Sequence, residues 1–135
     1  MPEESLLWSY SGRTIVIVHP ERPPSDVRWD AMLEESLARP EIDRVLVYSA
    51  GGAPNSKQSV RLTDALRQRD ARVSVLTAST KVRVATLALR LFRPEIHFFR
   101  PTELKPAFDH LGATPEERAE LVRVLEELKG QLGLA

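Results

Sequence analysis

Apolar residues along this chain follow two alternating patterns. Some form short, continuous runs rich in valine and isoleucine, which favour strands covered on both faces. Others recur every three or four positions over longer stretches, which predicts helices that bury one side. The continuous runs lie at 13–19, 44–48, 72–77 and 96–99, and each predicts a strand. A further strand is expected at 6–10, and the turn Ser11-Gly12 that joins it to the run at 13–19 predicts an opening β-hairpin.

Helix boundaries are marked by capping residues and prolines. Ser25 or Asp26 caps a first helix that Pro40 ends, and a second helix begins after the loop 49–56. The order of elements is β-β-α-β-α-β-α-β-α-α, and strands that alternate with helices pair in parallel. We therefore expect an α/β fold: a single domain with a mixed sheet of about five strands, an N-terminal β-hairpin, helices packed on the sheet and an extra C-terminal helix. The later helix starts are predicted at Ser79 or Thr80, at Thr102 and at the capping box Thr114-Pro115-Glu116-Glu117.

The third predicted helix, which runs to about Phe92, is apolar almost all round. Its polar residues form only a narrow stripe of Arg83, Thr86, Arg90 and Arg93. A helix of this kind is usually buried on two sides. Two interpretations stay open: the final helix covers the apolar surface, or the surface is exposed and serves homodimerisation or another partner.

Composition and charge limit the partners, the cysteine chemistry and the cellular location that we expect for this protein. Its 135 residues fit one domain, and Lys plus Arg equals Asp plus Glu at 19 each, so no global field favours nucleic acid or an anionic membrane. There is no cysteine, which excludes disulfides and thiolate metal sites. No apolar run approaches the ~20 residues of a membrane span, and the acidic residues 1–5 lack a secretory pattern. The expected location is the cytoplasm, with no nucleic-acid partner and no membrane span.

The loop after the strand at 44–48 is the first candidate binding surface. It joins a glycine pair to a helix start, where free backbone amides and the helix dipole favour an anion. A lysine beside the helix start adds a positive charge. The alternative is a structural turn in which an asparagine or serine caps the helix. The candidate residues are Gly51, Gly52, Asn55, Ser56 and Lys57.

A second strand-to-helix junction, at 77–83, lies beside the first in a parallel sheet. Its candidate residues are Ser79, Lys81 and Arg83. Together with Lys57 they would form one basic rim suited to a phosphate or a partner. The alternative is that these are solvated charges at helix starts, as most exposed lysines and arginines are.

Other side chains offer no catalytic or metal-binding pattern. His19, His97 and His110 are scattered without the spacing of a metal site, and the serines have no evident base in the sequence. We therefore expect no catalytic residues, no metal site and no cofactor.

The order of elements over about residues 5–112 resembles the STAS domain, the fold of bacterial anti-sigma-factor antagonists and of the SpoIIAA-like proteins. In signalling members, a serine in an Asp-Ser-Ser-Gly type motif at a helix start is the phosphorylation switch. In this chain Asn55-Ser56-Lys57-Gln58 takes that place. Ser56 keeps the hydroxyl, whereas Asn55 replaces the aspartate, and Lys57 and Gln58 replace the small residues.

The resemblance implies a STAS-like domain at 1–112 and a C-terminal helix at 113–135 that packs on the same domain. It also implies a non-catalytic signalling module that binds a protein partner, with Ser56 as the phosphosite and a kinase-like anti-sigma factor as the partner class. Two other functions stay open on the same fold. One is binding of a small molecule or lipid, which needs an apolar pocket between helix and sheet. The other is a small enzyme acting on a phosphorylated substrate, which needs an activated nucleophile or base.

Overall fold

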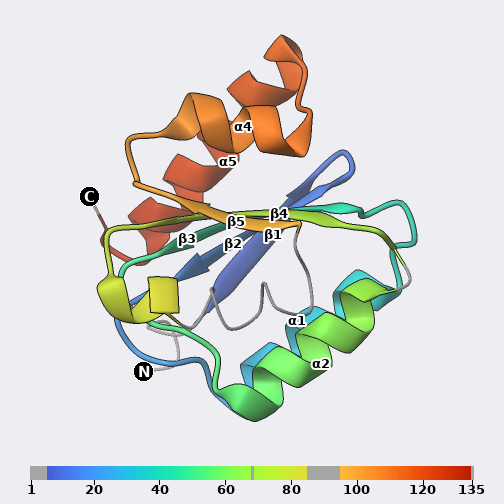
Figure 1. Cartoon of the computed structure of the whole chain (residues 1–135), viewed down its shortest axis with the longest axis vertical. Helices are drawn as coiled ribbons and strands as arrows, with labels where there is room; N and C mark the ends of the chain where they lie inside the picture. Colours follow the sequence, from blue (N-terminus) through green and yellow to red (C-terminus); the bar gives the residue numbers. More distant parts are fainter. Residues whose placement is uncertain (1–5, 68, 85–94, 135) are drawn as a thin grey trace.

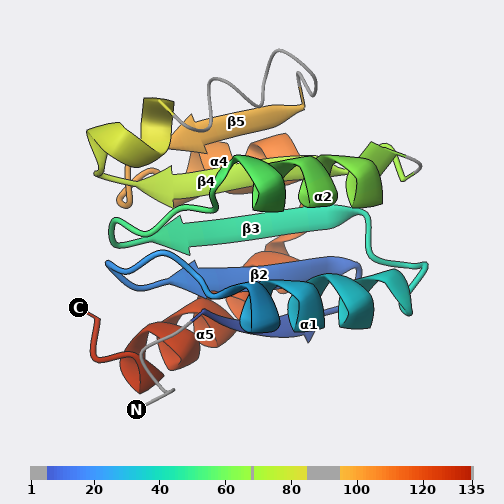
Figure 2. The ribbon, with the colours of Figure 1, turned by 90° about the horizontal axis from the view of Figure 1, so that it is seen from below.

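The predicted strands form one mixed sheet in the computed structural model, which describes residues 6–67, 69–84 and 95–134. The strands follow one another across the sheet in chain order, and Figure 2 shows β2 to β5 side by side. The first pair is antiparallel and forms the predicted hairpin, and every later pair is parallel. The α/β fold class predicted from the sequence is therefore confirmed. The strands are β1 (Leu7–Ser11), β2 (Thr14–His19), β3 (Arg44–Ser49), β4 (Arg72–Thr77) and β5 (Ile96–Phe99).

The helices cover both faces of this sheet. Because β2 to β5 are adjacent in chain order, right-handed crossovers place the helices between them on one face. The two C-terminal helices lie on the opposite face, and Figure 1 shows the two helical layers on either side of the strands. A further helix begins at residues 80–84, after β4. The crossover helices are α1 (Asp26–Leu37) and α2 (Ser56–Arg67), and the C-terminal helices are α4 (Leu104–Leu111) and α5 (Pro115–Gln131).

Each face of the sheet has its own hydrophobic core. Alternate residues of β2 point to opposite faces, so Ile15 and Ile17 join the core under α1 and α2, whereas Val16 and Val18 join the core under α4 and α5. All six residues of β2 are buried. This double burial explains why its sequence is a continuous apolar run rather than an alternating one.

The helix ends largely follow the predicted capping residues. Ser25 caps α1, Gly112 ends α4 in the left-handed conformation, and Thr114 forms the predicted capping box at the start of α5. The prediction for α4 was wrong, because Glu103 rather than Thr102 occupies the N-cap position. The Glu103 side chain accepts a hydrogen bond from the Arg100 amide at 2.7 Å and so closes the preceding turn.

The final helix does not cover the described start of the third helix. Val82 belongs to the core under α1 and α2, whereas Leu121 and Leu125 of α5 belong to the core on the opposite face. The handedness of the crossovers, rather than mutual apolarity, decides which face each helix covers. Most of the predicted all-round apolar surface, and with it the homodimerisation interpretation, falls at 85–94, outside the described residues. Among the described helices, none has the length and apolar character needed to cross a bilayer.

Candidate functional site

The carboxyl ends of β2, β3 and β4 meet at one edge of the sheet, where the connections to the helices also lie. Figure 2 shows the strand tips and the helix starts on the same side of the molecule. In many α/β sheets a crevice opens at this edge because the strand order reverses there. The order here does not reverse between β2 and β5, so the crossover helices stay side by side. This edge is therefore framed by neighbouring loops and helix starts rather than by two diverging helices.

Gly51 and Gly52 hold two of these loops together. The Gly52 amide donates to the Pro20 carbonyl at 2.8 Å, and a Cβ at this position would lie 2.2 Å from the Arg22 carbonyl oxygen. Gly51 has a φ of 144°, which favours glycine, and its amide donates to Ser49 Oγ at 3.1 Å. Gly52 is thus required by the close approach of the loops, and Gly51 is favoured by its backbone conformation. The anion-binding interpretation of this glycine pair gains no support from their contacts.

Asn55 caps α2 through a reciprocal pair of hydrogen bonds. Its side-chain oxygen accepts from the Gln58 amide at 2.8 Å, while Gln58 Oε1 accepts from the Asn55 amide at 3.0 Å. This is the geometry of a capping box, and it satisfies two of the amides that a helix start leaves unpaired. The structural alternative considered for Asn55 is therefore the one observed. Ser56 and Lys57 follow in the first turn, and both are exposed.

Gln58 is the residue at this edge that sequence reasoning missed. Its side chain is 1% exposed, and its Nε2 donates to the Pro24 carbonyl at 3.1 Å and to Asp26 Oδ1 at 2.9 Å. The backbone carbonyl of Gln58 accepts a hydrogen bond from Trp29 Nε1 at 3.0 Å. One buried amide thereby joins the starts of α1 and α2. The Asn-x-x-Gln spacing at 55–58 is a capping-box pattern and could have revealed half of this role.

The second junction has a similar helix start but does not complete the predicted basic rim. Ser79 caps the helix, since its Oγ accepts from the Val82 amide at 3.2 Å, and Lys81 is exposed. Arg83, in contrast, packs over the Phe98 ring with its guanidinium carbon 5.1 Å from the ring centre. The Nε atom of Arg83 is buried. Lys57 and Lys81 therefore remain as exposed cations, whereas Arg83 belongs to the packing against β5.

The two helix starts match position by position. Counting from the capping residue, each has a hydroxyl residue next, then an exposed lysine, a buried residue at the third position and an exposed valine at the fifth. Val60 is 60% exposed and Val84 is 62% exposed. In α1, Val27 in the first turn is 80% exposed. We call these residues together the strand-end surface: Val27, Ser56, Lys57, Val60, Lys81 and Val84.

Most of the large exposed apolar residues lie in the first two turns of the crossover helices. In the part of the chain that the structure describes, four large apolar residues are mostly exposed, and only Leu37, at the far end of α1, lies away from the strand tips. Single exposed apolar residues are ordinary, but grouped ones mark interaction sites. The arrangement offers apolar contacts beside two lysines.

A comparison of the chain with protein-family models and with curated proteins finds no match. Function must therefore be inferred from the geometry and from the sequence resemblance described above.

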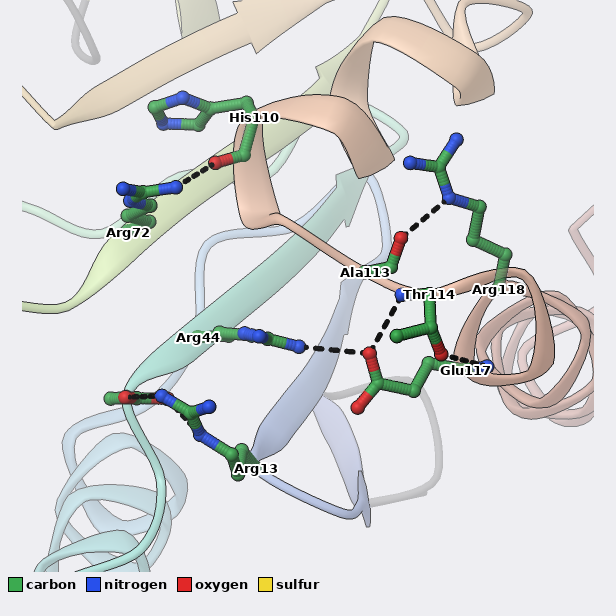
Figure 3. A network of polar contacts seen from close by, with 9 residues as sticks. Arg13, Arg44, Arg72, His110, Ala113, Thr114, Glu117 and Arg118 are labelled. Carbon is green, nitrogen blue, oxygen red and sulfur yellow. Dashed lines mark hydrogen bonds and ion pairs between the residues drawn. The ribbon is translucent and has the colours of Figure 1, made fainter.

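The opposite edge of the sheet carries a polar network that serves the fold. Figure 3 shows Arg44 donating to Glu117 at 3.1 Å, which ties the start of α5 to β3, and Arg72 reaching the His110 carbonyl at 3.4 Å. An open hollow of about 420 Å³ lies beside these arginines. Arg13, Arg44 and Arg72 are balanced there by Asp43, Asp70 and Glu117. This balance leaves no net charge to attract an anion.

The three histidines do not form one cluster. His97 of β5 and His110 of α4 lie together with their ring centres 4.1 Å apart, whereas His19 of β2 lies near Trp29 of α1. Within the described ranges, no group of three or more acidic or histidine side chains is arranged to hold a metal ion.

His19, Ser49 and Thr77 form a row of buried polar side chains at the last positions of β2, β3 and β4. The Ser49 hydroxyl donates to the Gly52 carbonyl at 2.5 Å, and the Thr77 hydroxyl donates to the Ser49 carbonyl at 3.0 Å. His19 Nδ1 is buried without a hydrogen-bond partner. Ser49 and His19 thus lie side by side on β3 and β2, but no hydrogen bond joins the Ser49 hydroxyl to His19 Nδ1 as a nucleophile to its base.

Acid should weaken the fold through His19. Burial lowers the pKa of His19 from 6.5 to about 4. Between these pH values the unfolded chain takes up a proton that the native protein does not. The free energy of unfolding should therefore fall by about 3 kcal/mol as the pH drops from 6.5 to 4, and this loss should be absent above pH 6.5. Urea denaturation at a series of pH values measures it.

The matched control is His19→Leu, which removes the titrating group and keeps an apolar side chain of similar size. Carboxylates such as Glu117, whose pKa is held below its usual value first by the Thr114 amide, also respond to acid in both proteins. The difference between the two stability curves isolates His19. Parallel curves between pH 6.5 and 4 would contradict the assignment.

Proposed function

We propose that this protein is a non-catalytic regulatory module that binds a protein partner through the strand-end surface. The observation that carries the proposal is the recurrence of an exposed lysine and an exposed valine at matched positions of two helix starts. Protein interfaces combine an apolar centre with a polar rim, and truncation of a few central residues usually accounts for most of the lost affinity. Val60 and Val84 supply the apolar part of such a surface.

The charges on this surface favour an acidic partner. Lys57 and Lys81 are exposed two residues after the capping residues Asn55 and Ser79, where the helix dipole also presents its positive end. The first turn of α2 contains no acidic residue. Carboxylates on a partner would meet both the lysines and the helix ends, which speeds association and fixes orientation.

The polar groups beneath the surface support binding rather than catalysis. The hydroxyls of Ser49 and Thr77 are already used to hold the loops, and no hydrogen bond connects His19 Nδ1 to either of them. A serine or threonine nucleophile needs an adjacent base. The arrangement therefore favours the interaction module over the small enzyme considered from the sequence.

The resemblance to anti-sigma-factor antagonists gives the proposal its specific form. The partner class is a kinase-like anti-sigma factor, and Ser56 is the phosphosite. The exposure of Ser56 at the first position of α2 supports this, because a kinase can reach it without unfolding the helix. Asn55 keeps the cap that a modified Ser56 would need.

Substitution of the exposed valines should weaken partner binding without loss of stability. We expect Val60→Ser or Val84→Ser to reduce affinity at least ~10-fold each, since truncated central contacts often cost more than 1 kcal/mol. Their melting temperatures should stay near that of the wild type, because both side chains are exposed. The partner is identified by crosslinking from a photoreactive residue at position 60, and affinity is then measured by titration calorimetry with the purified partner.

Leu37→Ser is the matched control, since Leu37 is 52% exposed on α1 but lies away from the strand tips. It should bind the partner like the wild type. If crosslinks form equally well from position 37, or if all three variants bind equally, the strand-end surface is not the interface.

Charge at Ser56 should act on the partner and not on the fold. Phosphorylation adds about −1.5 to −2 charges, and the N-terminus of a helix tolerates them. We expect Ser56→Asp to weaken partner binding, because a carboxylate would repel an acidic partner, while its melting temperature stays nearly unchanged. Ser56→Ala, which adds no charge, should bind normally. Equal binding by both variants would remove the switch from the proposal and leave Ser56 as a helix-start residue.

A further inference from the structure

A small apolar cavity lies between the sheet and the crossover helices, and its lining includes His19 and Ser49 at the strand ends. Its volume is about 60 Å³. Sheet side chains that include Ile17, Val47 and Val75 form its floor, and Trp29 of α1 and Leu62 of α2 form its walls. A cavity needs roughly 10–15 Å³ on this measure to hold one water, so there is room for about four to six water-sized groups.

His19 is the polar side chain of this lining that has a free hydrogen-bonding atom. It is 4% exposed, and its Nδ1 has no hydrogen-bond partner. The described lining also contains the hydroxyl of Ser49, which already donates to the Gly52 carbonyl and accepts from the Gly51 amide. A buried nitrogen without a partner destabilises the folded protein, so a ligand that pairs with this nitrogen recovers part of that cost.

Water alone fits this site poorly. A buried water is held by two to four polar partners, and among the described lining side chains only His19 has an unused one. The remaining lining is mainly aliphatic and aromatic. The lining therefore suits a molecule with an apolar body and a single polar group. A hydroxyl suits either tautomer of the imidazole, because it can both donate and accept.

We propose that this cavity binds a small aliphatic alcohol, with the apolar chain against the valines of the sheet and the hydroxyl hydrogen-bonded to His19 Nδ1. The cavity size sets the ligand at about four to six heavy atoms. The loop that includes Gly52 and Pro54 closes one side of the cavity and leads directly to the cap of α2. The site does not depend on the proposed partner function, and its test requires no partner.

The experiment titrates the purified protein with 1-butanol and with 1-fluorobutane, a chain of equal length whose fluorine is a poor hydrogen-bond acceptor. Binding is measured from backbone amide shifts of the strand ends and of the loop around Pro54. In the wild type both ligands should produce saturable shifts at these residues. In His19→Leu, the ratio of butanol affinity to fluorobutane affinity should fall about 2- to 10-fold, the value of one hydrogen bond.

Leu62→Phe is the second variant, and it fills the cavity from α2 without touching His19. It should lose the response to both ligands while keeping the wild-type amide spectrum elsewhere. Three results would overturn the proposal: no saturable shifts with either ligand in the wild type, an unchanged affinity ratio in a folded His19→Leu, or undiminished binding to a folded Leu62→Phe.

Discussion

The geometry of the strand-end surface depends on one buried amide. Gln58 is enclosed by the first turns of α1 and α2, and its side chain makes hydrogen bonds to the Asn55 amide, the Pro24 carbonyl and Asp26. A buried amide of this kind is stable only when its donors and acceptor are paired, since each unpaired group costs about 1–3 kcal/mol. The two helices must therefore start where Gln58 can reach both. Gly52, pressed against Pro20 and Arg22, holds the preceding loops at the same place.

This constraint explains how exposed apolar residues can be tolerated. Val27 and Val60 are exposed in turns whose backbone is fixed by the capping box and by the Gln58 amide, so they remain presented to solvent and cannot collapse inward. A surface that is fixed before a partner arrives loses little conformational entropy when it binds. The cavity beside His19 is lined by the loop residues Gly52 and Pro54, and the Nδ1 atom of His19 is buried there without a hydrogen-bond partner.

Much of the fold was predictable because its signals are local. The β-branched run of β2 and the Ser11-Gly12 turn specify a buried strand and a hairpin, and the capping box at Thr114 specifies the start of α5. The same local reasoning found the two helix starts of the candidate site. It did not find the role of Gln58, since its partners Pro24 and Asp26 lie more than thirty positions earlier in the chain.

Long-range geometry also bears on interpretations that the sequence left open. One of the two interpretations of the third helix had the final helix covering it, but crossover handedness puts the described start of the third helix on the opposite face from α5. Arg83 was expected to join the lysines, whereas Phe98 of β5 offers its guanidinium a ring to pack on. Neither outcome is encoded within a few residues of the segment concerned.

Hydrogen exchange of a Gln58→Met variant tests most directly whether the buried amide organises the strand-end surface. Methionine keeps the size of the side chain and removes its hydrogen bonds. The account predicts that amides in the first turns of α1 and α2, including those of Trp29 and Ser59, exchange at least ~10-fold faster, as expected for a loss of about 1.4 kcal/mol or more in local stability. Amides in the centres of β2 and β3 should lose less of their protection from exchange than the amides of these helix starts. Exchange that is unchanged at the helix starts, or that accelerates equally throughout the sheet, would contradict this account.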